Sequence, residues 1–178
     1  MKASLLTVAA ALACSSAAHA QVLDSMPPAD SGPRAPIGAI SPCVVQRIVD
    51  GDTIRCRDIG LVRFIGVDSP EPTQRPFGGI ASAGLAAMLS PGDTVQLEPD
   101  VEERDRYRRI LAYVWRDGSM LNWRMVRLGW AVVLTYRPNV QYEDQFMSAQ
   151  AMARDERRGL WGIDAFVCPP VQRRRRAC

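Results

Sequence analysis

The sequence predicts a small closed β-barrel that carries helices, a fold of the α+β class. Five short segments have the alternation or the β-branched residues typical of strands, and turn dipeptides separate several of them. Three other segments space their apolar residues as helices do. A sheet of short strands loses its unpaired edges when it closes into a barrel. The length of 178 residues, with 47% hydrophobic and 23% charged residues, indicates one globular domain.

The first three strands are predicted to form a meander. We expect strands at 44–49 and 53–57, because the Asp50-Gly51 dipeptide between them is a strong hairpin signal. A second turn at Asp58-Ile59-Gly60 leads to a third strand at 61–67.

The rest of the domain mixes helices with extended segments. An Ala-rich stretch at 78–90 has helical spacing and ends at Pro91-Gly92. The last two strands of the barrel are expected at 95–97 and 109–115. The remaining predicted elements are a short helix at 120–128, an extended segment at 131–135 and a helix at 141–158.

Both ends of the chain differ from the domain at 41–168. Residues 1–20 combine a charged start, a short apolar run and a small-x-small site, which predicts a signal peptide and an exported protein, periplasmic or secreted. The apolar run is too short to span a membrane; a buried N-terminal helix and a lipidated Cys14 are the alternatives. The Pro-rich segment 21–40 is expected to be a disordered linker, and 169–178 a basic tail.

Removal of residues 1–20 leaves an even number of cysteines, which favours disulfides in an exported chain. We prefer the pairs Cys43–Cys56 and Cys168–Cys178, because the first two flank the predicted hairpin turn. Zinc binding is the alternative, but the chain lacks the C-x-x-C spacing that zinc sites commonly use.

Removal of residues 1–20 also takes away His19 and Lys2, the only histidine and the only lysine. The mature chain then excludes Ser-His-Asp and Cys-His catalysis, His-ligated zinc and lysine Schiff bases. Net charge says little about nucleic-acid binding by the domain, which holds 16 Arg against 17 Asp and Glu. The excess of positive charge comes from the tail, which either binds a phosphate backbone or is a solvated end.

Two acidic clusters remain as candidates for chemistry. A meander can return Asp68, after the third strand, to the neighbourhood of Asp52 at the first turn. Two carboxylates and a backbone carbonyl suit a hard cation such as Ca²⁺. The alternative is that both are ordinary turn acids. Arg63 lies on the third predicted strand, five residues before Asp68, and Arg109 lies at the start of the fifth. Guanidinium forks bind phosphate, so two converging arginines would form a phosphate clamp; the alternative is that each is a solvated surface charge.

Three blocks of sequence together resemble the staphylococcal nuclease (thermonuclease-like) family. They are Val49-Asp50-Gly51-Asp52-Thr53, Val62 to Glu71 (VRFIGVDSPE), and Asp105-x-Tyr107-x-Arg109-x-Leu111-Ala112-Tyr113. Weaker similarities continue at Phe77 to Ser82, Asn122 with Val126 to Ala131, Tyr136-Arg137-Pro138-Asn139 and Gly159-Leu160-Trp161. The resemblance covers about residues 43–162, in order and at family-like spacing.

This resemblance implies a five-stranded OB-fold barrel with three α-helices and a Ca²⁺-dependent nuclease of DNA and RNA that cleaves the 5′ P–O bond and leaves 3′-phosphates. It implies metal ligands at Asp52, Asp68 and the Ser69 carbonyl. It assigns Glu71 as the general base or the residue that positions the water, with Arg63 and Arg109 on the scissile phosphate. Two aromatic residues, Tyr107 and Tyr136, are expected to line the nucleotide pocket.

Two departures from the family pattern stand out. Ser69 replaces the usual Thr, which a backbone ligand should tolerate. Arg108 fills a slot usually taken by Gly, so a positive φ there would cost free energy. A catalytically idle OB-fold module that binds single-stranded nucleic acid or a protein is the alternative function, and an envelope protein with vestigial acids is a third. A monomer without a membrane span is expected.

Overall fold

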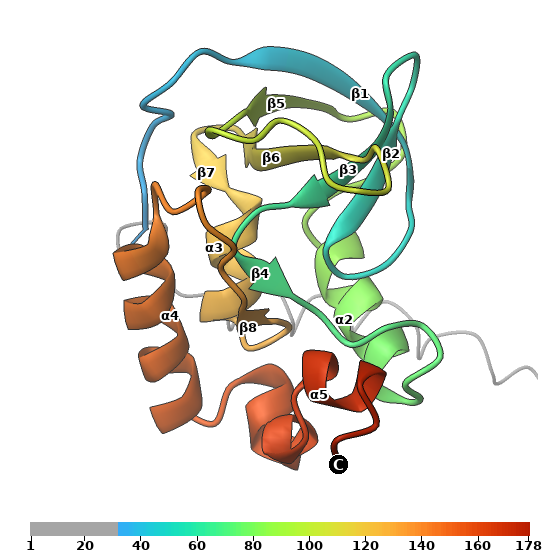
Figure 1. Ribbon diagram of the computed structural model, residues 1–178, viewed down its shortest axis with the longest axis vertical. Coiled ribbons are helices and arrows are strands. Elements are labelled where there is room, and N and C mark those ends of the chain that lie inside the picture. Colours follow the sequence, from blue (N-terminus) through green and yellow to red (C-terminus); the bar gives the residue numbers. More distant parts are fainter. Residues whose placement is uncertain (1–31) are drawn as a thin grey trace, which may run out of the picture.

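The computed structural model describes residues 32–178 (Figure 1). The predicted signal peptide and most of the predicted linker lie outside the described residues. Among the helices of the described part, none has the length and apolar character needed to cross a lipid bilayer.

Five strands close into a barrel, as the sequence predicts. They are β1 (Ser41–Ile48), β2 (Thr53–Cys56), β3 (Gly60–Phe64), β5 (Thr94–Glu98) and β6 (Ile110–Arg116). Antiparallel pairs run in the order β3-β2-β1-β5-β6, and a parallel pair between β3 and β6 closes the sheet. A short strand β7 (Ser119–Met120) extends β6 as a hairpin. This closed barrel confirms the predicted fold class.

The helices gather at one end of the barrel (Figure 1). They are α2 (Phe77–Ala86), α3 (Leu121–Arg127) and α4 (Glu143–Asp155), followed by the 3₁₀ turns η2 (Gly159–Ile163) and η3 (Ala165–Val167) and the helix α5 (Pro170–Arg174). The fully buried Leu85, Met125 and Phe146 join the strands in one core. Burial of each such side chain stabilises the folded state by about 1.5–3 kcal/mol.

The third predicted strand is interrupted where the sequence expects it to continue. Strand β3 ends at Phe64, and Gly66 has φ +78°, a backbone conformation that residues with a Cβ rarely adopt. A Cβ at Gly66 would also collide with the ring of Phe146 on α4. The chain then forms β4 (Val67–Asp68), which pairs with β8 (Val132–Val133) in a separate two-stranded sheet. Because of this break, Asp68 is held outside the barrel wall.

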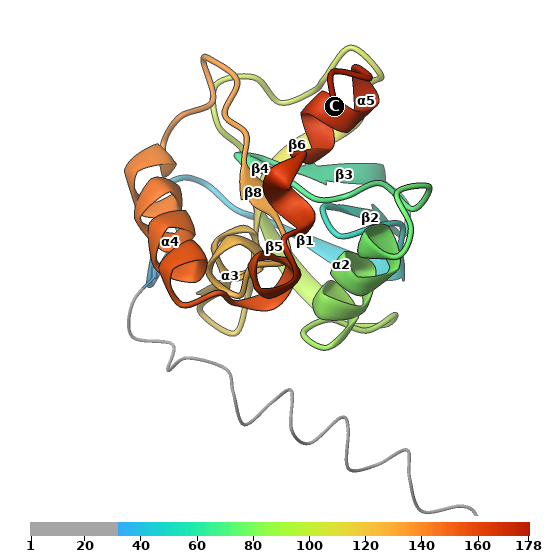
Figure 2. The same cartoon turned by 90° about the horizontal axis from the view of Figure 1, so that it is seen from below.

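Both candidate disulfides are present in the structure, with the preferred pairing. Cys43–Cys56 joins β1 to β2 with a Cα–Cα distance of 5.7 Å, and Cys168–Cys178 joins the two ends of the C-terminal segment. The segment 169–178, predicted as a basic tail, contains the helix α5. Because the disulfide joins Cys168 to Cys178, the segment folds back as a closed loop. Figure 1 shows α5 below the segment between β4 and α2, and Figure 2, the view from below, shows it in front of the barrel strands.

A buried carboxylate ties the end of the predicted linker to the barrel. Glu98 on β5 has no exposed surface, and it accepts hydrogen bonds from Trp115 Nε1 (2.8 Å), Gln141 Nε2 (2.8 Å) and the Tyr142 hydroxyl (3.1 Å). The backbone N–H groups of Ile37 (2.8 Å) and Gly38 (2.7 Å) donate to the same carboxylate. Nothing in the sequence pattern distinguishes Glu98 from the surface acids.

We expect Glu98→Ala to destabilise the protein by about 3–5 kcal/mol, because the buried donors of Trp115 and Tyr142 would lose their acceptor. Urea unfolding followed by tryptophan fluorescence measures this loss. The matched control is Glu102→Ala, which removes an exposed carboxylate and should change stability by less than about 0.5 kcal/mol. Equal effects of the two substitutions would contradict the structural role of Glu98.

Candidate active site

Two buried carboxylates meet at one guanidinium. Arg63 Nε lies 3.2 Å from Asp52 Oδ1, and Arg63 Nη2 lies 3.4 Å from Asp68 Oδ1. The side chains of Asp52 and Asp68 are 7% and 1% exposed, so this charge cluster is largely shielded from water. The convergence of Asp52 and Asp68 that the meander predicts is therefore observed. Burial of this degree is unusual for turn acids that only cap a surface loop.

The local fold explains how these side chains meet. In the β2–β3 ladder Thr53 pairs with Arg63, which places Asp52 beside the end of β3. The backbone N–H of Ser69 donates to Asp52 Oδ2 at 2.6 Å, which joins the segment after β4 to the first turn. Gly51 permits this approach, because a Cβ there would lie 2.8 Å from the Cβ of Ser69. Asp68 itself is fixed by its register partner Val132 on β8.

The electrostatics of this cluster favour additional positive charge. Burial raises the pKa of the Asp68 carboxyl, although attraction to Arg174 and Arg63 opposes the shift. Burial, followed by repulsion from Asp52, raises the pKa of the neighbouring Asp50 to about 7. Carboxylates that are costly to ionise in isolation are stabilised by a nearby cation.

The donor set fits a hard cation, by its chemistry. The side chains of Asp52 and Asp68 offer carboxylate oxygens, and Ser69 follows directly with a backbone carbonyl. Oxygen donors of this kind suit Ca²⁺ and Mg²⁺ rather than zinc. Within residues 32–178, no group of three or more His, Cys, Asp or Glu side chains is arranged to hold a metal ion. A cation at this site would thus depend on two carboxylates and on backbone or solvent oxygens.

Glu71 lies on the loop that connects β4 to α2. Its backbone is held in place, since Gln74 N donates to the Glu71 carbonyl at 2.8 Å and Gln74 Oε1 accepts from Glu71 N at 3.1 Å. Gly78 packs against this carbonyl so closely that a Cβ would overlap it. The carboxylate remains 41% exposed and pairs with Arg174 Nη1 at 3.1 Å. A rigid loop thus presents an accessible carboxylate beside Asp68.

Arg109 has a different partner from Arg63. It precedes β6, and its Nε bonds Asp105 Oδ2 at 2.7 Å while Asp105 Oδ1 accepts from its backbone N–H at 2.9 Å. The parallel register pairs Arg63 with Leu111, so Arg109 lies two residues before the partner of Arg63, just ahead of β6. The two arginines thus lie on neighbouring segments, but the structure ties Arg109 to Asp105 rather than to Asp52 or Asp68.

The turn before Arg109 has the backbone conformation that the sequence comparison suggested. Arg108 has φ +66°, in the left-handed region that favours glycine. The Asp105 carbonyl accepts from Arg108 N at 2.9 Å, and the Arg108 carbonyl accepts from Arg104 Nη1 at 2.9 Å. These hydrogen bonds hold the turn despite the unfavourable φ, and the Asp105 pairing still fixes Arg109.

An Arg108→Gly variant is expected to be more stable by about 0.5–1 kcal/mol, because glycine adopts a positive φ without a steric cost. Differential scanning calorimetry measures the gain as a higher Tm. Arg106→Gly on the same turn, where the structure has no positive φ, is the control and should lower stability. A lower Tm for Arg108→Gly would show that the Arg108 side chain contributes more than its backbone strain costs.

Tyr107 and Tyr136 are both exposed aromatic side chains, 65% and 64% respectively. The guanidinium of Arg109 lies 5.6 Å from the centre of the Tyr107 ring. Their two loops are joined by Asn139, which accepts from Glu102 N at 2.7 Å and donates to the Glu102 carbonyl at 2.8 Å. This link keeps the loop that carries Tyr136 against the loop that leads to Tyr107. Within residues 32–178, neither tyrosine forms a hydrogen bond with Asp52, Asp68 or Glu71.

Sequence reasoning gave no role to three residues that shape this site. Asn122, part of one of the weaker family-like motifs, is fully buried on α3, donates to the carbonyls of Ile65 and Ala112 and accepts from Val114 N. Asn139 also stood in such a motif without a role. Arg174 was assigned to a basic tail that binds a phosphate backbone or is solvated, but its guanidinium bonds Asp68. The only signal for Arg174 is the preferred Cys168–Cys178 pair, because such a bridge turns the tail back on itself.

Comparison with known proteins agrees with this geometry. The model of the family described as staphylococcal nuclease homologue matches residues 61–162. The thermonuclease of Staphylococcus hyicus is 38% identical over 125 residues, which cover 66% of this chain and 73% of that protein. The thermonuclease of Staphylococcus intermedius is 36% identical over 126 residues, 66% of this chain and 74% of that protein.

A third relative is larger than the matched region. The SPbeta prophage-derived endonuclease YokF of Bacillus subtilis (strain 168) is 34% identical over 133 residues, which cover 69% of this chain but 45% of that protein. The family model covers more than half of the chain, and the match covers nearly three quarters of the Staphylococcus hyicus relative. Together with the closed barrel and its acid cluster, these matches establish that the chain belongs to the staphylococcal nuclease family.

Proposed function

We propose that this protein is an exported, Ca²⁺-dependent nuclease that hydrolyses DNA and RNA at the 5′ P–O bond and leaves 3′-phosphate ends. Hydrolysis of phosphodiester bonds as an endonuclease is the activity of the family to which the chain belongs. The finer statements rest mainly on one observation, the meeting of Asp52, Arg63 and Asp68 with Glu71 beside them.

The cation would be held by Asp52, Asp68 and the backbone carbonyl of Ser69. Hard oxygen donors and the raised pKa of Asp68 support this assignment, and Ca²⁺ is the ion that the family resemblance implies. When bound, the ion would stabilise negative charge on the phosphoryl oxygens during attack. The protein contributes the position of the two carboxylates, which the turn after β1 and the β4–β8 pair keep fixed.

Glu71 would accept the proton of the attacking water, or position that water. Its carboxylate is accessible to water and its backbone is held by Gln74, so it can be kept within hydrogen-bond reach of an attacking water, as a general base must be. Arg63 would bind the scissile phosphate and stabilise its developing charge with the fork geometry of guanidinium. Arg109 would do the same after exchanging Asp105 for the substrate, because its present partner is a carboxylate of the same charge as phosphate.

The exposed rings of Tyr107 and Tyr136 would stack on nucleobases. Stacking on aromatic side chains contributes about 1–3 kcal/mol per base and tolerates any sequence, since every base has a π-face. Stacking engages the base and not the sugar, so it would not distinguish DNA from RNA, and little sequence preference is expected.

Export is supported by the two disulfides. Disulfides persist in oxidising compartments such as the periplasm or the extracellular medium and are rare in the cytosol. Together with the predicted signal peptide, they favour a protein that acts outside the cytoplasm.

The experiment that tests this function is digestion of a plasmid and of an RNA by the oxidised protein. We expect cleavage of both substrates with Ca²⁺, loss of cleavage with EGTA and recovery when excess Ca²⁺ is restored. End labelling before and after phosphatase treatment should identify 3′-phosphate products. Cleavage that persists in EGTA would reject the metal dependence. Binding without cleavage in Ca²⁺ would support the alternative of a catalytically idle OB-fold module.

A further inference from the structure

We propose that the disulfide-closed C-terminal loop, residues 168–178, is an autoinhibitory latch whose Arg174 competes with the divalent cation for Asp68. This inference rests on the proposed metal-dependent function. In this arrangement the guanidinium of Arg174 neutralises Asp68, and the loop must move away before a metal ion can bind there.

The contacts of Arg174 carry the proposal. Arg174 Nη2 lies 2.8 Å from Asp68 Oδ1 and 3.0 Å from Asp68 Oδ2, so it engages both oxygens of this carboxylate. Arg174 Nη1 lies 3.1 Å from Glu71 Oε1. One guanidinium therefore spans the proposed metal ligand and the proposed general base. Charge-assisted hydrogen bonds of this kind are about twice as strong as neutral ones.

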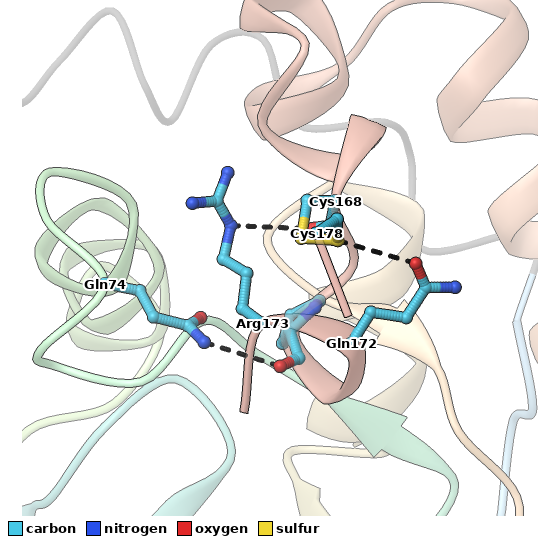
Figure 3. Close-up of a disulfide and its surroundings, with 6 residues drawn as sticks. Gln74, Cys168, Gln172, Arg173 and Cys178 are labelled. Carbon is cyan, nitrogen blue, oxygen red and sulfur yellow. Dashed lines mark hydrogen bonds between the residues drawn. A yellow bond between two sulfur atoms is a disulfide. The ribbon is translucent and has the colours of Figure 1, made fainter. Parts of the chain in front are cut away.

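The loop that carries Arg174 is anchored on the same side of the molecule as Glu71. Figure 3 shows the Cys168–Cys178 bridge with its neighbours: Arg173 Nε donates to the Cys168 carbonyl at 3.2 Å, and Gln74 Nε2 donates to the Pro170 carbonyl at 3.4 Å. The guanidinium of Arg173 also lies 5.6 Å from the centre of the Phe77 ring at the start of α2. The disulfide limits the conformations of α5 and thus holds Arg174 near Asp68.

A metal ion and Arg174 would both bind to the carboxylate oxygens of Asp68. A cation bound to Asp68 uses the carboxylate oxygens that Arg174 now engages, so the two cannot both hold them fully. Arg63 also approaches Asp68, but it lies on β3 with a side chain that is 14% exposed. The Arg174 side chain is 35% exposed and belongs to a short terminal helix. Arg174 is therefore the cation that can leave.

The departure of Arg174 has an open path. Its side chain lines an open cavity together with Glu71, Thr73, Gln74, Arg173, Arg176 and Cys178. The ion pair with Glu71 is exposed and therefore weak, because solvent screens it, whereas the pair with Asp68 is partly buried. The Asp68 pair is thus the contact that a doubly charged ion must replace, and the latch would set the concentration at which the ion binds.

Ca²⁺ binding measured by isothermal titration calorimetry tests this inference independently of catalysis. Arg174→Gln should lower the Kd for Ca²⁺ by about three- to tenfold, because the competing cation is gone. The matched control Arg175→Gln removes the same charge from the next residue of the loop and should stay within about twofold of wild type. A Cys168→Ser/Cys178→Ser variant keeps Arg174 but removes the tether, and its Kd should also fall.

Hydrogen exchange gives a second readout in the unmodified protein. Addition of Ca²⁺ should speed exchange of the backbone amides at 171–176, because the ion releases the loop. Unchanged Kd in Arg174→Gln, or slower exchange of the loop with Ca²⁺, would overturn the latch while leaving an active, Ca²⁺-dependent wild-type nuclease intact. Reduced activity of Arg174→Gln at saturating Ca²⁺ would instead make Arg174 a substrate-binding residue and would also overturn it. Failure of every variant to bind Ca²⁺ would reject the latch and the proposed metal together.

Discussion

A Glu71→Gln variant should lose about 10²- to 10⁴-fold of kcat, the usual contribution of a general base. The substitution keeps the size and hydrogen-bonding shape of the side chain but removes its ability to accept the proton of water. The carboxylate is 41% exposed and its loop is fixed through backbone contacts to Gln74, so the fold should be unaffected. Loss of activity would then report on chemistry rather than on stability.

The measurement is plasmid cleavage at saturating substrate and Ca²⁺. Glu103→Gln, at an exposed position near β6, is the matched control and should keep wild-type kcat. A Glu71→Gln enzyme with a wild-type rate would remove Glu71 from the mechanism.

Arg63→Ala should lower kcat by about 10²- to 10³-fold, the scale for loss of one preorganised donor to a transition-state oxyanion. The structure adds a second effect, because Asp52 and Asp68 would lose the guanidinium that lies between them. Arg63→Lys retains the charge but not the planar fork, so it should recover the stability better than the activity.

Cleavage kinetics and thermal unfolding together separate these two effects. Arg47→Ala, at an exposed position on β1, is the control for loss of an arginine from the barrel.

Arg109→Ala is expected to lower kcat by about 10²-fold, for the same reason as Arg63→Ala. If Arg109→Ala kept its activity, the Asp105 pairing seen here would be the whole role of Arg109.

Much of the barrel follows from local sequence. The Asp50-Gly51 turn and the alternation around it define β1, β2 and β3, because short hairpins depend on neighbouring residues. The break at Gly66 was not predictable in the same way. It depends on Phe146, which approaches from a helix far along the chain. The parallel pair of β3 with β6 likewise joins distant segments that no local pattern specifies.

In the candidate site, too, some features follow from local sequence and others depend on contacts with distant residues. Asp52 and Asp68 were expected to converge, since a meander returns the chain to its starting point, and the structure brings them together. The partners that now hold the site residues were not foreseen. Asp105 holds Arg109, Asn139 joins the two tyrosine loops and Arg174 covers Asp68. Each is a polar side chain in a loop or a tail, where spacing carries little information about the partner.

The pairing of β4 with β8 also bears on the order in which the molecule is made. Asp68 is fixed by Val132, from the opposite half of the sequence, and the barrel is closed by another long-range pair, β3 with β6. Contacts between distant segments form late, since the chain must first lose the entropy of a long loop. A nascent chain that has reached α3 therefore has its acidic residues but not their arrangement. For a nuclease made inside a cell that holds its own nucleic acids, this topology delays assembly of the acid cluster until β8 has been synthesised.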